Sequence, residues 1–198
     1  MRQRGQYVAR SAFKLLELHQ AVGLIRPHAC IVDLGAAPGG WIQAAREIER
    51  SSNIIGVDLV PLHPAVAALS GLVFIQGDMH AAETHARLEG ALKQRTQDGK
   101  ADVVLSDMLP NVSGSRARDA LLSVDLCEAV VGFATTHLRP SDSPSLVIKA
   151  LESGHLVEFE REVLRKRFKQ ARRVKPASSR SDSREVYLVA TGVQQEEI

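Results

Sequence analysis

Short runs of consecutive apolar, mostly β-branched residues alternate along the chain with longer stretches whose apolar residues recur at helical spacing. Continuous apolar runs are typical of strands buried on both faces, as in parallel sheets covered by helices. The sequence therefore predicts a three-layer α/β sandwich with a mostly parallel sheet. The predicted strands are 31–34, 54–58, 72–75, 103–105, 146–148 and 186–189, and the predicted helices lie near 12–19, 41–50, 82–95, 117–138 and 156–170.

The last part of the chain departs from this alternation. Residues 171–175 could form one more strand before Pro176, and a final strand is predicted over 185–191. A parallel pair needs a crossover of a dozen or more residues, and the connection here is shorter. We therefore expect the final strand to pair antiparallel, at an edge of the sheet.

The composition is that of an ordinary globular protein, with 44% hydrophobic and 24% charged residues among 198. It excludes a coiled coil, a collagen, a wholly disordered chain and a disulfide scaffold. The only cysteines, Cys30 and Cys127, lie far apart among apolar residues, which fits a reducing compartment better than a secreted one. No apolar run approaches the roughly 20 residues that a membrane span needs, so we expect no membrane span.

The formal net charge of +2 conceals a strong segregation of charge. Residues 1–20 carry a net charge of +3 and residues 161–184 a net charge of +8, whereas the rest of the chain carries −9. Basic ends around an acidic middle indicate a polyanionic partner held by the two termini. The alternative interpretation of each basic run is a solvated helix face.

Four charged residues stand where predicted strands end. Asp58 closes the second strand, and Asp78, Asp107 and Lys149 follow the third, fourth and fifth. In open parallel sheets, ligands bind outside the carboxyl ends of the strands, near the switch in strand order. A single Asp at such a place is ordinarily a turn residue or a helix cap. Four charged residues in equivalent positions predict a binding site.

A glycine-rich loop, residues 33–41, leads from the first predicted strand into the next helix. Its glycines let the backbone turn tightly and approach a ligand closely, but its spacing matches neither the dinucleotide fingerprint nor a Walker A loop. Asp58 follows Gly35 by 23 residues, where a carboxylate can accept hydrogen bonds from a ribose diol. Asp78, with apolar Met79 beside it, is placed to accept from the exocyclic amine of adenine. Together these features favour S-adenosylmethionine over a dinucleotide.

A series of short motifs extends this interpretation: 11–15, 32–41, 76–78, 105–108, 110–114, 147–149 and 183–187. In this order they resemble the FtsJ family of ribose 2′-O-methyltransferases, from about Ser11 to Gly192. The resemblance implies a Rossmann-like, S-adenosylmethionine-dependent methyltransferase sandwich with a mostly parallel sheet and an antiparallel last strand. We expect one methyltransferase domain over 1–198, with a basic N-terminal helix (1–20), a cofactor-binding core (28–150) and a basic C-terminal segment (156–192).

The resemblance also implies a catalytic set at Lys14, Asp107, Lys149 and Glu185. A ribose hydroxyl is a poor nucleophile, so it needs a base or a group that stabilises the developing alkoxide. Lys149 is the candidate, the nearby cation of Lys14 would favour its uncharged form, and the two acids would hold the ammonium groups. No metal is expected, because the transferred methyl group already sits on a sulfonium. The implied cofactor-binding residues are Gly35, Pro38, Gly39, Gly40, Trp41, Asp58, Asp78 and Asp107.

Several of these residues also have a plain structural interpretation. Lys14 alone would be a surface lysine on an amphipathic helix, Lys149 the solvated end of a strand, and Glu185 the exposed start of an edge strand. Trp41 is either a core side chain, as the sequence alone favours, or a lid on the cofactor, as the resemblance favours. The complete set of four in family order favours catalysis.

The expected reaction is 2′-O-methylation of a uridine ribose in large-subunit ribosomal RNA, contributing to ribosome assembly. The partner would be ribosomal RNA, the large subunit or its precursor, bound by a monomer. Arg2, Arg4 and Arg10, with the basic residues of 161–184, would follow the RNA phosphates. Because only 4% of residues are aromatic, recognition is expected to use RNA shape and backbone. A transfer RNA substrate, or a non-catalytic ribosome-assembly factor that retains the fold, remains an alternative.

The N-terminus bears on localisation. The first 16 residues contain arginines and no acidic residue, as transit peptides do, and residues 115–128 look more like the mitochondrial branch of the family. Lys14 lies so close to Met1 that cleavage of the usual length would remove it. The prediction is a mitochondrial protein, with the cytoplasm as the alternative.

Overall fold

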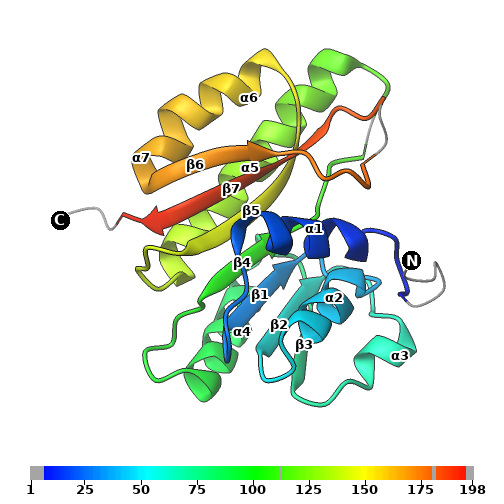
Figure 1. Ribbon diagram of the computed structural model, residues 1–198, viewed down its shortest axis with the longest axis vertical. Helices are drawn as coiled ribbons and strands as arrows, with labels where there is room; N and C mark the ends of the chain where they lie inside the picture. The colour runs from blue at the N-terminus through cyan, green and yellow to red at the C-terminus, as the bar shows by residue number, and fades with distance from the viewer. Residues whose placement is uncertain (1–6, 112, 180–181, 195–198) are drawn as a thin grey trace.

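The computed structural model describes residues 7–111, 113–179 and 182–194, and its strands form one sheet in the order β3-β2-β1-β4-β5-β7-β6 (Figure 1). Strands β1 to β5 run parallel to one another, whereas β7 is antiparallel to both β5 and β6. The predicted α/β sandwich with an antiparallel last strand is therefore confirmed. The strands are β1 Cys30–Leu34, β2 Asn53–Asp58, β3 Leu72–Gln76, β4 Val103–Ser106, β5 Pro144–Leu151, β6 Phe168–Val174 and β7 Glu185–Val193.

The expected place of β7 at the sheet edge is wrong. Strand β7 lies between β5 and β6, and β6, which the sequence suggested only as a possible strand over 171–175, forms the edge. An interior strand must be apolar on both faces, and Val186 to Ala190 of β7 are all at most 2% exposed. Strand β6 instead exposes Lys169 and Arg172, and charged side chains of this kind protect an edge from further pairing.

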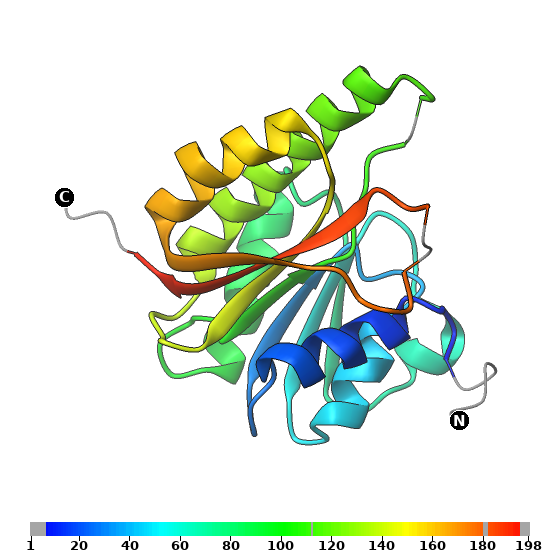
Figure 2. The same cartoon turned by 45° about the horizontal axis from the view of Figure 1, so that its top comes forward.

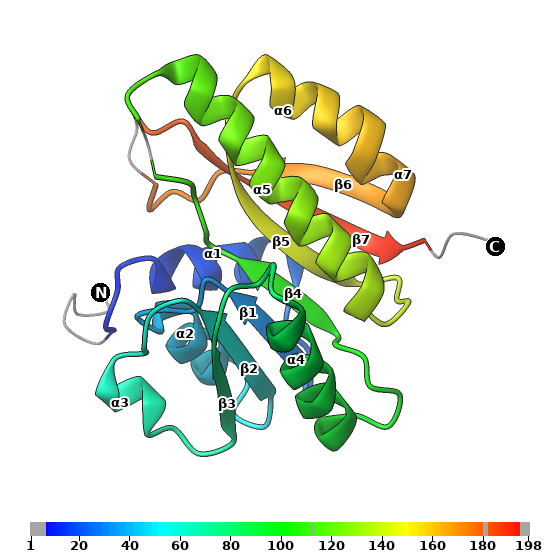
Figure 3. The same ribbon diagram turned by 180° about the vertical axis from the view of Figure 1, so that it is seen from behind.

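Helices cover both faces of the sheet. Helices α1, α2 and the short α3 pack on one face, and α4, α5 and the α6–α7 segment pack on the other (Figures 2 and 3). The sequence analysis did not predict α3, and the helix it expected over 156–170 ends before the buried, extended Phe168. The helices are α1 Ala12–Val22, α2 Gly40–Ile48, α3 Pro64–Ala67, α4 Ala82–Arg95, α5 Arg116–His137, α6 Gly154–Phe159 and α7 Arg165–Arg167, with a π-helical turn at Glu160–Leu164.

Helix α1 carries the first predicted catalytic residue to the sheet. Ala12, Leu15 and Leu18 recur at helical spacing and are completely buried against α2 and the sheet. The helix ends at Gly23, whose φ of +64° only glycine adopts easily, and the Gly23 N–H donates to the last turn. This anchoring fixes the partly buried Lys14 beside the carboxyl ends of the strands.

Among the described helices, α5 alone is long and apolar enough, by length and composition, to cross a membrane. Its apolar side, however, packs on the sheet. Cys127, Val130, Val131 and Ala134 are at most 1% exposed and belong to the core with β5 and β7. The apolar character of α5 is thus explained by its place in the core of the sandwich.

His137, in the last turn of α5, is a buried titratable group within this core. It is 3% exposed, its Nε2 has no hydrogen-bond partner among the described residues, and its ring lies 4.5 Å from that of Phe133. Burial lowers the pKa of His137 to about 4, and the nearby His85 adds to the shift. The unfolded chain therefore binds a proton at a higher pH than the folded protein does.

We expect His137 to make the fold sensitive to mild acid. The unfolded state gains a proton near pH 6.5 and the folded state only near pH 4, so stability present above pH 6.5 is lost as the pH falls. At pH 5 the loss relative to pH 7 is about 2 kcal/mol. Replacing His137 by Met, which has similar volume and no charge, should remove this part of the pH dependence in urea unfolding curves. His155→Met, an exposed control, should behave like the parent, and an unchanged slope in His137→Met would contradict the prediction.

Candidate active site

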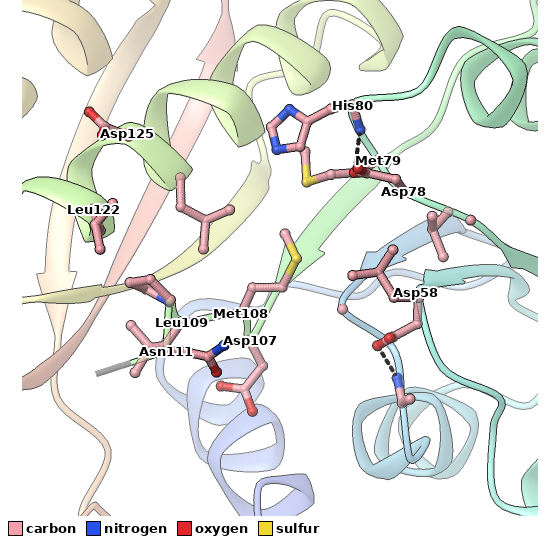
Figure 4. A pocket seen from close by; sticks show the side chains of 17 residues that line it. Asp58, Asp78, Met79, His80, Asp107, Met108, Leu109, Asn111, Leu122 and Asp125 are labelled. Carbon is pink, nitrogen blue, oxygen red and sulfur yellow. Dashed lines mark hydrogen bonds between the residues drawn. The ribbon is translucent and has the colours of Figure 1, made fainter. Parts of the chain in front are cut away.

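A cavity of about 700 Å³ opens at the carboxyl ends of the parallel strands, bounded on its far side by the first half of α5 (Figure 4). Four of the predicted cofactor-binding residues line it: Gly35, Asp58, Asp78 and Asp107. The remaining lining residues are Ala37, Val57, Leu59, Gly77, Met79, His80, Met108, Leu109, Pro110, Asn111, Leu122, Asp125 and Leu126.

The loop from β1 to α2 forms one wall of this cavity because it turns sharply at Gly35. Gly35 has a φ of +76°, and a Cβ there would lie 2.1 Å from Cγ of Met108. The N–H groups of Gly35 and Ala36 both donate to the carbonyl of Val57, at 2.9 and 3.1 Å. Only glycine permits this close approach between the loop and the residues after β4.

Two carboxylates at this wall are held in place by backbone N–H groups. Asp58 accepts from the N–H of Ala37 at 2.8 Å and from that of Val60 at 3.0 Å, one bond to each oxygen. Asp78 accepts from the N–H of His80 at 2.9 Å through Oδ1. A carboxylate has about four acceptor positions, so both acids keep unused acceptors at the cavity.

The other four predicted cofactor-binding residues are not among those that line the cavity. A Cβ on Gly39 would lie 2.6 Å from Val66 of α3, so this glycine lets the loop pack on α3. Trp41 is 3% exposed, and its indole N–H donates to the carbonyl of Ser11 at 2.9 Å. The predicted contact of Pro38, Gly39, Gly40 and Trp41 with a cofactor stays a prediction.

The four predicted catalytic residues meet beside the cavity as two ion pairs. Nζ of Lys14 lies 2.6 Å from Oε2 of Glu185, and Nζ of Lys149 lies 3.0 Å from Oδ1 of Asp107. All four side chains are largely buried, with exposed fractions between 11% and 26%. Residues from α1, β5, β7 and the end of β4, up to 171 positions apart, are thus gathered at one place.

Tyr187 joins the two ion pairs, a role that its place in the 183–187 motif did not predict. Its hydroxyl donates to Oδ1 of Asp107 at 2.7 Å, and its ring centre lies 5.6 Å from Nζ of Lys14. The ring also packs on Trp41, with the centres 5.8 Å apart. The only sequence signal was the position of Tyr187 two residues after Glu185, on the same face of the strand.

Electrostatics at the site follow from this pairing. Burial alone would raise the pKa of Glu185, but the hydrogen bond from Lys14 and the charges of both lysines outweigh it and lower that pKa. Burial, together with Asp107, raises the pKa of Tyr187 far above its usual range, so its hydroxyl remains a donor. The cluster therefore holds the carboxylate of Glu185 charged and the phenol of Tyr187 neutral.

Asp33 of β1 is a further buried acid near the cavity. It is 1% exposed, and neither carboxylate oxygen has a hydrogen-bond partner among residues 7–111, 113–179 and 182–194. Burial, followed by the charges of Asp107 and Asp58, raises the pKa of Asp33 well above its usual value. The raised pKa favours the uncharged form of Asp33. The surroundings favourable for a cation are therefore made by the acids that line the cavity, Asp58, Asp78, Asp107 and Asp125.

A second cavity, of about 420 Å³, lies on the other side of the ion pairs. It is lined by Arg10, Lys14, Asp182, Ser183 and Glu185. The cluster thus stands between a cavity lined by four acids and one lined by two basic and two acidic side chains. In the part of the chain that the structure describes, no group of three or more His, Cys, Asp or Glu residues could hold a metal ion.

Known proteins resemble this chain over nearly its whole length. A crystal structure described as that of a ribosomal RNA methyltransferase from Plasmodium falciparum superimposes with a TM-score of 0.80 at 26% identity, covering 94% of this chain and 98% of the other. Two bacterial relatives are each named ribosomal RNA large subunit methyltransferase E. The one from Polaromonas naphthalenivorans is 39% identical over 95% of this chain and 78% of its own length. The one from Acidiphilium cryptum is 42% identical over 93% of this chain and 76% of its own length.

The pattern that defines the FtsJ-like methyltransferase family matches residues 7–193, which include the glycine-rich loop and all four residues of the ion pairs. This match covers far more than half of the chain and agrees with the resemblance noted in its motifs. The chain therefore belongs to the FtsJ-like methyltransferase family.

Proposed function

We propose that this methyltransferase transfers a methyl group from S-adenosylmethionine to the ribose 2′-hydroxyl of a uridine in large-subunit ribosomal RNA. The observation that carries the proposal is the double ion pair, Lys14 with Glu185 and Lys149 with Asp107, between two cavities. The names of the two bacterial relatives support the substrate class.

The larger cavity fits a cationic nucleoside. Its volume of about 700 Å³ is within the range of small-molecule sites, and four acids line it: Asp58, Asp78, Asp107 and Asp125. Asp58 would hold the ribose diol and Asp78 the adenine amine. When bound, S-adenosylmethionine supplies an electrophilic methyl group that already carries its leaving group.

The chain itself has to bring a hydroxyl to that methyl group in line with the bond that breaks. Lys149 is assigned to the ribose 2′-hydroxyl, because an amine can take the proton in its uncharged form and stabilise the oxygen in its charged form. Asp107 orients Nζ of Lys149, and Tyr187 fixes the same carboxylate oxygen from β7. Lys14 is held by Glu185 next to this pair.

Residues 161–184 offer fewer unpaired charges to RNA than their net charge of +8 suggests. Lys166 pairs with Glu162, Lys169 with Asp142, and Arg173 with Glu160. The proposed phosphate contacts therefore rest on the exposed Arg10 and Arg172, which have no such partner among the described residues, and on neighbouring basic side chains that can exchange partners. Arg2, Arg4 and Arg180 lie outside the described residues.

The test is to map ribose methylation directly. Large ribosomal subunits from cells that lack this protein, their stripped RNA and transfer RNA are each incubated with the enzyme and S-adenosylmethionine. We expect one uridine of large-subunit RNA to gain a 2′-O-methyl group, located by nucleoside mass spectrometry after nuclease mapping. Methylation of a base or of transfer RNA, or ribosome binding without methylation, would contradict the proposal.

Replacing Lys149 by Ala should abolish methyl transfer while leaving cofactor binding nearly intact. Loss of a proton-transferring group costs about 100-fold or more in kcat, and Lys149 does not line the larger cavity. We expect the affinity for S-adenosylhomocysteine, measured by calorimetry, to change only a few-fold. Lys93→Ala, an exposed control on α4, should retain the parent rate. A normal rate in Lys149→Ala would show that the roles are assigned wrongly.

Replacing Asp58 by Ala should act on the cofactor instead. The change removes two charge-assisted acceptors for a ribose and also frees the N–H groups of Ala37 and Val60. We expect the Kd for S-adenosylhomocysteine to rise roughly 10- to 100-fold, as for the loss of hydrogen bonds to a charged group. Asp142→Ala serves as an exposed acidic control. Unchanged affinity in Asp58→Ala would exclude the ribose role.

A further inference from the structure

The turn between β3 and α4, residues 77–81, forms the end of the cavity that holds Asp78. Asp78 and Met79 lie together there, across the cavity from Leu122 and Asp125 (Figure 4). The turn is closed by the bond from the N–H of Ala81 to the carbonyl of Asp78, at 3.0 Å. Its shape decides where the free acceptors of Asp78 point.

Helix α4 contacts this turn at two places. Gly77 packs so closely on the first turn of α4 that a Cβ there would lie 2.4 Å from the hydroxyl oxygen of Thr84. Nε2 of His85 lies 2.8 Å from the carbonyl oxygen of Met79. A carbonyl oxygen can only accept a hydrogen bond, so Nε2 of His85 carries the proton.

The imidazole of His85 is itself held by rings of α5. Its centre lies 5.6 Å from that of Phe133 and 5.8 Å from that of His137. Phe133 and His137 are 6% and 3% exposed, so these rings form a rigid support within the core. A continuous series of contacts therefore connects α5, through the imidazole of His85, to the main chain of Met79.

We propose that His85 is a positioning residue that sets the selectivity of the cavity for the purine base of its cofactor, acting through the carbonyl of Met79. The inference rests on the proposed use of S-adenosylmethionine. With the carbonyl of Met79 held by His85, the turn keeps Asp78 aimed at an exocyclic amine, which donates a hydrogen bond to a carboxylate. A purine with oxygen at that position presents an acceptor to the same carboxylate and is rejected.

The experiment compares two ligands on three proteins by calorimetry. The ligands are S-adenosylhomocysteine and S-inosylhomocysteine, whose purines carry an exocyclic amine and an exocyclic oxygen, the latter with a proton on N1. The proteins are the parent chain, His85→Leu, which lacks a donor, and His85→Gln, whose amide nitrogen can take the place of Nε2 and donate to Met79. His155→Leu, on the exposed side of α6, is the matched control for loss of an imidazole.

We expect His85→Leu to bind S-adenosylhomocysteine about fivefold more weakly, as for the loss of one hydrogen bond, and to lose part of its preference for the amine. His85→Gln should restore both the affinity and the preference, and kcat at saturating cofactor should be unchanged in both variants. If His85→Leu fails to fold, His85→Asn replaces it, because its shorter amide cannot reach Met79.

Three results would overturn the inference: unchanged affinity in His85→Leu, an equal loss of affinity for both ligands, or no rescue by His85→Gln. These outcomes differ from failure of the proposed function. If the proposed function is wrong, the parent protein itself would bind neither ligand, or would bind both without preference.

Discussion

The carboxylate of Asp107 connects three strands at the end of the sheet where both cavities open. It follows β4, and its Oδ1 accepts from Nζ of Lys149 on β5 and from the hydroxyl of Tyr187 on β7. The contact with Tyr187 requires β7 to pair directly with β5, where Lys149 lies opposite Tyr187. If β7 lay at the sheet edge beyond β6, Tyr187 would be a strand further from Asp107. The antiparallel insertion of β7 is thus what completes the cluster.

Pairing of charges explains how so many ionised groups can be largely buried. Removing an ion from water costs several kcal/mol unless a partner and further hydrogen bonds compensate. Each lysine of the cluster has a carboxylate partner, and the cluster as a whole is close to neutral. Asp58, Asp78 and Asp125 also line the larger cavity, while Arg10 and Asp182 also line the smaller one. The larger cavity therefore suits a cation.

The glycine-rich loop shows how one motif can serve packing and binding together. Gly35 turns the loop at the cavity, whereas Gly39 allows close contact with Val66 of α3. Trp41 packs between Ser11, just before α1, and the ring of Tyr187, so the motif also supports the cluster. On the opposite side of the cavity a core side chain also supports a loop of the site, because His85 links the turn at Met79 to the rings of α5.

Hydrophobic periodicity was enough to predict the sandwich, the parallel strands and the line of charged residues at their ends, because these features follow from a few neighbouring residues. The motifs were enough to predict which lysines and acids form the cluster. Neither could place β7 inside the sheet, since strand order depends on contacts between residues far apart in the chain, such as Lys149 with Tyr187. The sequence alone favoured a core position for Trp41, as found. Neither showed that Tyr187 bonds to Asp107, or that many basic residues of 161–184 are already paired. Such side-chain partners depend on packing between residues that are far apart in the chain. Burial makes an unpaired polar group costly there, and this cost cannot be predicted from a local stretch of sequence.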